Sequence, residues 1–105
     1  MKSAPQIPEA VGPVLVRGFI GEAVADAIRS RAADVSVDVS VIDRGAYLRI
    51  LAPGGCALRR ADIERRLGRA FTFPGDLEEV MPSWKGEIEF HPDEVIWRPG
   101  APRSP

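Results

Sequence analysis

The chain has 105 residues, and its 14 basic and 15 acidic side chains give a formal net charge of −1. Because the two signs are interspersed, charge by itself does not indicate nucleic acid or anionic lipid as a partner. A single Cys excludes an internal disulfide framework, and no apolar run approaches the roughly 20 residues that cross a bilayer.

Prolines mark both ends of the chain, at positions 5 and 8 and again at 99, 102 and 105. We therefore expect flexible tails at residues 1–10 and 99–105, and a single domain over residues 11–98. The segment Met1–Glu9 lacks the apolar run of a signal peptide, so the expected location is the cytosol.

The first half of the domain, residues 11–52, is expected to form a β-α-β-β unit. The predicted elements in chain order are a strand over Pro13–Arg17, a helix over Ile20–Ala33, a strand over Val35–Val41, a turn at Asp43–Gly45 and a strand over Ala46–Ala52. The helix is indicated by apolar residues three and four apart, and the second strand by valines that alternate with polar residues. Gly45 supplies the conformational freedom that a hairpin turn requires.

The second half, residues 56–98, repeats this order without a detectable sequence repeat. The predicted elements are a strand over Cys56–Leu58, a helix over Ala61–Leu67 capped by Gly68, one more helical turn over Asp76–Val80, and a hairpin of Glu87–His91 with Glu94–Arg98. The hairpin residues expected in the core are Ile88, Phe90, Val95 and Trp97. The fold class is therefore α+β, with two β-α-β-β units in one compact domain and a mostly antiparallel sheet.

Residues that do chemistry are scarce. His91, Asp93 and Glu94 lie on one predicted turn with no second His or Cys nearby in sequence, so polar turn residues are the favoured interpretation over a metal site. Cys56 and His91 could act as nucleophile and base only if the fold joined them, and Cys56 stands in an apolar stretch where an inert thiol is usual. We expect no catalytic residue, no metal and no cofactor.

A basic run covers the second predicted helix and its flanks. It consists of Arg59, Arg60, Arg65, Arg66 and Arg69. Acidic residues interleave with it, which favours a solvated helix face. The alternative is a small nucleic-acid-binding α+β module that uses Arg59–Arg69, and salt-sensitive retention on nucleic acid would support it.

Two features suit a protein interface. Tyr47 and Arg49 alternate with Leu48 and Ile50, so one side of the first hairpin presents an aromatic ring and a guanidinium. The loop Met81–Gly86 carries a Met and a Trp, which are either tucked beneath the loop or offered to a partner. The alternative for the hairpin is that Tyr47 lies flat on the sheet beside the stem of Arg49. Both interpretations of each feature remain open from sequence.

At these segments the sequence resembles the effector, or coupling, proteins of bacterial soluble di-iron monooxygenases that act on methane, phenol, toluene and alkenes. The matching stretches are Val11–Leu15, Asp43–Ile50, Leu67–Arg69 with Phe71, and Met81–Trp84 with Gly86 and Ile88. They extend over nearly the whole chain, which is similar to the shorter aromatic and alkene type. The fold that the resemblance implies is also a pair of β-α-β-β units.

The resemblance implies a protein without cofactor or catalytic residue that docks on the hydroxylase component above its di-iron centre. There it would tune substrate and O₂ access and the coupling of NADH oxidation to hydroxylation or epoxidation. We expect a monomer when free, with no nucleic acid or membrane partner. The expected contact residues lie on the first hairpin and the loop: Arg44, Tyr47, Arg49, Met81, Pro82, Ser83, Trp84 and Gly86.

Overall fold

Two antiparallel sheets enclose a long helix in the computed structural model, which describes residues 10–100. The strands are β1 (Gly12–Val16), β2 (Ser40–Asp43), β3 (Tyr47–Leu51), β4 (Cys56–Arg59), β5 (Ser83–Lys85), β6 (Glu87–Phe90) and β7 (Glu94–Arg98). One sheet has the order β2-β3-β1-β5 and the other the order β4-β7-β6. Every pair of neighbouring strands is antiparallel, which confirms the α+β class.

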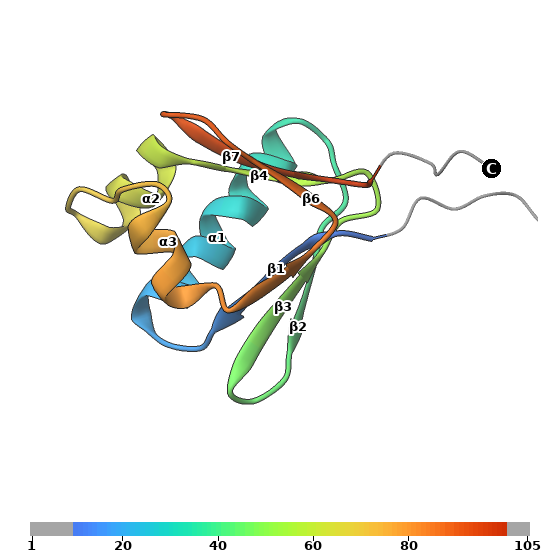
Figure 1. The fold of residues 1–105 in the computed structure, drawn as a ribbon, viewed down its shortest axis with the longest axis horizontal. Helices are drawn as coiled ribbons and strands as arrows, with labels where there is room; N and C mark the ends of the chain where they lie inside the picture. The colour runs from blue at the N-terminus through green and yellow to red at the C-terminus, as the bar shows by residue number, and fades with distance from the viewer. Residues whose placement is uncertain (1–9, 101–105) are drawn as a thin grey trace, which may run out of the picture.

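The helices are α1 (Phe19–Asp34), α2 (Arg60–Leu67) and α3 (Gly75–Val80). The sheets diverge from one end of the molecule, and α1 lies between them (Figure 1). Val24 and Ile28 on its buried face are fully inaccessible, as helical spacing predicts. Gly68 ends α2 in the left-handed conformation, and its N–H donates to the Glu64 carbonyl at 2.8 Å, so the predicted cap is confirmed.

The predicted strand over Val35–Val41 is wrong except at its last two residues, because β2 begins only at Ser40. After α1 ends, the Val37 N–H donates to the Ala32 carbonyl at 2.9 Å and the Ser36 N–H to the Ala33 carbonyl at 3.3 Å. Ser36 has a φ of 58°, so this is a Schellman cap with serine in the place that glycine usually takes. The cap uses backbone groups that a strand would need, and it leaves Val35 and Val37 exposed.

The predicted loop over Met81–Gly86 contains a strand that was not expected. β5 pairs with β1, which places Ser83 opposite Val14 and Trp84 opposite Pro13. A strand from the second half of the chain therefore completes the sheet of the first half. The first β-α-β-β unit is present as predicted, whereas the second has α3 and β5 inserted before its last two strands.

Gly86 marks the point where the chain crosses from one sheet to the other. Its φ is 97°, and a Cβ added there would lie 2.6 Å from Val11 Cγ1 and 2.7 Å from the Arg98 carbonyl oxygen. Both the backbone conformation and the close approach exclude other residues without local rearrangement.

The remaining predicted elements agree with the structure to within one residue at each end. Val95 and Trp97 are fully buried and Ile88 packs against the core, as expected. Phe90 is not a core residue, because it stands at the end of β6 beside the hairpin turn and is 39% exposed. The predicted tails fall mostly outside the described residues. Among residues 10–100, no helix is long and apolar enough to cross a membrane.

Candidate docking surface

The first hairpin, β2 with β3, presents the side chains that the alternation predicted. Leu48 and Ile50 are buried against α1, whereas Tyr47 is 46% exposed and Arg49 is partly exposed. The hairpin extends away from the rest of the molecule (Figure 1). Tyr47 and Arg49 therefore point outward, away from the helices.

A polar lock holds the tip of this hairpin. Arg17, which follows β1, forms an ion pair with Asp43, and its Nε donates to the Gly45 carbonyl at 2.6 Å. Asp43 Oδ1 also accepts from the Gly45 N–H at 2.8 Å. The Arg17 guanidinium and this backbone bond lower the pKa of the Asp43 carboxyl. The lock fixes the turn on which Arg44 is exposed.

The strand registers define one continuous surface on the side of the four-stranded sheet away from α1. Directly opposed residues share a face, and residues along a strand alternate between faces. The side chains on this outer face belong to Ser40, Ile42, Tyr47, Arg49, Leu51, Val14, Val16, Ser83 and Lys85, with Gly12 between them. All three helices lie on the opposite side of the sheet (Figure 1).

The structure places the loop residues in three different environments. Met81 is 4% exposed and belongs to the core, so it anchors the chain just before β5. Ser83 joins Arg49 on the outer face through Val14, which pairs with both. Trp84 is 45% exposed, but it shares the face of Pro13, on the inner side of the sheet at its β5 edge.

The predicted contact residues are therefore only partly brought together. Tyr47, Arg49 and Ser83 share the outer face, and Arg44 lies at the hairpin tip. Trp84 and the exposed Pro82 lie at the β5 edge, and Gly86 has the structural role described above. Sequence reasoning missed the apolar outer-face residues of β1. The available signal was that Pro13–Val16 is apolar at every position, which is typical of a strand with both faces covered.

The structure does not support a nucleophile and base pair. Cys56 pairs with Trp97 at one end of the second sheet, whereas His91 lies on the turn beyond Phe90 and Val95 at the other end. Burial raises the pKa of the Cys56 thiol to about 12, so the thiol remains protonated at neutral pH.

The polar turn residues have protein partners. His91 Nε2 lies 3.2 Å from Glu89 Oε1, and Asp93 pairs with Arg60 at 3.5 Å. Within residues 10–100, no group of three His, Cys, Asp or Glu side chains is arranged to hold a metal ion. These contacts agree with the interpretation of this turn as a solvated hairpin end.

The arginine run is partly neutralised. Arg65 pairs with Asp62 at 2.7 Å, and Arg60 lies between Glu64 and Asp93. Arg69 donates to the Ala70 carbonyl instead of projecting freely. Two of the five cations are therefore compensated by carboxylates, which leaves fewer for a phosphate backbone than the sequence alone suggests.

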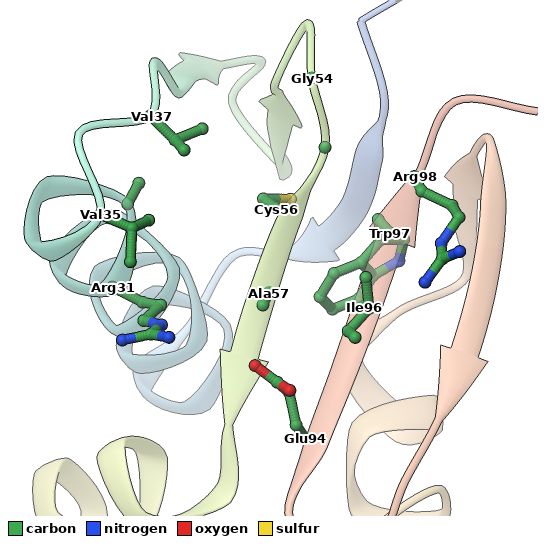
Figure 2. Close-up of a pocket in the computed structure, with 12 residues that line it drawn as sticks. Arg31, Val35, Val37, Gly54, Cys56, Ala57, Glu94, Ile96, Trp97 and Arg98 are labelled. Carbon is green, nitrogen blue, oxygen red and sulfur yellow. The ribbon is translucent and has the colours of Figure 1, made fainter.

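A groove of about 360 Å³ lies at the free edge of β4. Figure 2 shows Val35 and Val37 on one side of β4 and Ile96, Trp97 and Arg98 from β7 on the other. Its walls are mainly apolar, and its one thiol is the protonated Cys56. Arg31, Glu94 and Arg98 also line it, so the groove combines apolar contact with charged side chains and has no nucleophile among its described residues.

Comparisons with known proteins cover nearly the whole chain. A sequence model of the MmoB/DmpM family matches residues 9–98. The chain is 40% identical over 87 residues to the effector subunit of the alkene monooxygenase system of Xanthobacter autotrophicus (strain Py2), with 83% of each chain covered. Its fold is similar to that of a chain in the structure of a phenol hydroxylase–regulatory protein complex, with a TM-score of 0.70 at 20% identity, over 85% of this chain and 95% of that one.

Proposed function

Because the chain belongs to the MmoB/DmpM family, we propose that it is the non-catalytic effector of a multicomponent di-iron monooxygenase and that it docks on the hydroxylase component. The observation that carries this proposal is the 40% identity to an alkene monooxygenase effector subunit, with 83% of both chains covered. A cytosolic location and a monomeric free state belong to the same proposal.

The side-chain chemistry agrees with a role in binding. The thiol of Cys56 is protonated and distant along the sheet from His91, so the two do not form a nucleophile and base pair. The best-developed surface is instead an uncovered sheet face with a locked hairpin. A surface that is rigid before docking loses less conformational entropy when it binds.

An effector of this kind acts by linkage. It shifts the hydroxylase between two states only to the extent that it binds one of them better, by about 1.4 kcal/mol for each tenfold change. The docking surface must therefore fit one conformation of the hydroxylase selectively. We assign direct contact to Arg44, Tyr47, Arg49, Pro82, Ser83 and Trp84, and we assign to Met81 and Gly86 the support of β5 and its crossover.

A reconstituted assay tests the proposal. The protein is titrated into its hydroxylase, reductase and ferredoxin while product and NADH consumption are both measured. We expect product per NADH to rise and to saturate near one effector per active site. A coupling ratio that does not change over the titration would exclude the effector role.

A further inference from the structure

The charges on the outer face are of one sign. Its side chains come from four strands, and among these described positions Arg49 and Lys85 are the charged residues and no acidic residue occurs. The chain as a whole is slightly acidic, with a formal charge of −1. Lys85 already interacts with another group, so Arg49 is the charged side chain among these described positions that is available to a partner.

Asp43 lies on a strand of the same sheet but does not neutralise Arg49. Asp43 is opposite the buried Leu48, so it belongs to the inner side of the sheet, and it is bound by Arg17. Within residues 10–100, Arg49 has no ion pair or hydrogen bond through its side chain. Its guanidinium lies among apolar neighbours, since it is directly opposite Val14 on one side and Ile42 on the other.

The same face exposes apolar surface that no helix covers. Tyr47 is 46% and Val16 is 40% exposed, and the two are directly opposite each other. Val14, Ile42 and Leu51 continue this surface and are partly exposed. An apolar centre with an available guanidinium is the composition typical of a protein interface, where aromatic residues and Arg are enriched.

We propose that the outer face recognises a protein surface that combines apolar side chains with unpaired carboxylates. This inference rests on the proposed function, because the surface in question is that of the hydroxylase. Arg49 supplies the ion pair at the centre of the contact, and Tyr47 and Val16 supply the apolar contact beside it.

Charge favours the hydroxylase as the partner of this face over a second copy of the chain, nucleic acid or an anionic membrane. A second copy docked face to face would bring two Arg49 guanidiniums into one apolar contact, and like charges across an interface oppose association. Anionic membranes are bound by clusters of about four to eight cations and nucleic acid by several phosphate contacts, whereas Arg49 is the available cation among the described residues of this face and its neighbours are apolar.

The outer face is smaller than a standard protein interface, so the contact with the hydroxylase must extend beyond it. The four strands have 5, 4, 5 and 3 residues. At a spacing of about 4.8 Å between strands and a rise of about 3.3 Å per residue, they give a projected area of roughly 250 Å². A standard interface buries about 800 Å² on each partner. The outer face is therefore the centre of the contact, and the hairpin tip with Arg44 and the β5 edge form its rim.

The test is a charge reversal at Arg49. We expect Arg49→Glu to weaken binding to the hydroxylase by about tenfold or more, and Arg49→Gln to weaken it less. Val16→Asp, which adds a carboxylate on a different strand, should weaken binding as well. The matched control is Arg66→Glu, because it makes the same charge change on α2 and should bind like wild type. Thermal unfolding of each variant separates effects on binding from effects on the fold.

The outcomes separate this inference from the proposed function. If wild type raises coupling but the Arg49 and Val16 variants all bind the hydroxylase normally, the effector role stands and the outer face is wrongly assigned. If wild type neither binds the hydroxylase nor changes coupling, both fail. Binding of wild type to duplex DNA or to phosphatidylserine vesicles, lost in Arg49→Glu and unaccompanied by hydroxylase binding, would overturn the inference in favour of a polyanion.

Discussion

The two sheets each have one face that no helix covers. The two faces differ in whether their charged side chains have oppositely charged neighbours. On the outer face of the four-stranded sheet, Arg49 lies between Val14 and Ile42, and no acidic residue among the described ones pairs with it. On the three-stranded sheet, the corresponding face places Arg59 opposite Glu94, and Glu87 opposite Arg98. One face neutralises its own charges in water, and the other leaves a cation for a partner to neutralise.

This difference shows how a binding face can be recognised without a bound ligand. Both faces contain charged residues, so counting charges does not separate them. What separates them is whether a face leaves a charged side chain without a partner among the described residues, as the outer face does with Arg49. Arg98 Nη2, for example, already lies 3.0 Å from Glu89 Oε1. Docking on that face would have to replace this ion pair, whereas docking on the outer face adds a new one at Arg49.

The largest expected effect concerns Gly86, where the chain crosses from one sheet to the other. Gly86→Ala should lower the free energy of unfolding by about 2 to 5 kcal/mol, because its positive φ and the clash with Val11 and Arg98 act together. Denaturant unfolding measures this loss. The control is Gly54→Ala, where an added Cβ has open space and the change should remain within about 0.5 kcal/mol. Equal stability of the two variants would show that the crossover tolerates a side chain.

The next largest effect is expected at Trp84, and it tests whether the hydroxylase contact extends from the outer face to the β5 edge. Trp84→Ala should weaken hydroxylase binding by on the order of 2 kcal/mol, or about 30-fold, mainly through faster dissociation. Because Trp84 is 45% exposed, its removal should reduce the free energy of unfolding by less than about 1.5 kcal/mol. Paired unfolding and binding titrations measure both. Normal binding with a much lower stability would place Trp84 in the core and confine the contact to the outer face.

The sequence was sufficient for elements whose signal is local. The helix from Ile20 onward and the alternation of Tyr47 to Ile50 depend on residues close together in the chain, and the structure confirms both. The strand at Val35 was predicted wrongly because the Schellman cap that replaces it uses Ser36, a residue with no strong preference for the left-handed conformation.

The sequence was insufficient where the structure depends on distant pairing. β5 has three residues, and what makes it a strand is its pairing with β1, about 70 residues earlier in the chain. That pairing also decides the face on which Trp84 lies, and the loop sequence contains no signal for it. The outer face as a charge pattern could not be predicted either, because it becomes visible only when four strands are placed in register.

A smaller effect concerns the lock that positions the hairpin tip. The pKa of Asp43 is lowered from 3.8 in the folded protein, so its contact with Arg17 stabilises the fold above that value. The contribution is lost as the pH falls through the lower, folded pKa. We therefore expect Asp43→Asn to be less stable than wild type at neutral pH, and the difference to shrink at acid pH. Unfolding curves of both proteins across this range measure it, and a pH-independent difference would contradict the lock.

The smallest expected effect is on the self-neutralised face. Glu89→Gln keeps the shape of the side chain but removes the charge that Arg98 and His91 contact. Because all three groups are substantially exposed, the free energy of unfolding should change by less than about 1 kcal/mol. Binding to the hydroxylase should stay within about twofold of wild type, since no partner covers this face. If Glu89→Gln instead weakens binding as strongly as Arg49→Glu, the hydroxylase contacts both faces, and the pairing of charges within a face does not identify the docking surface.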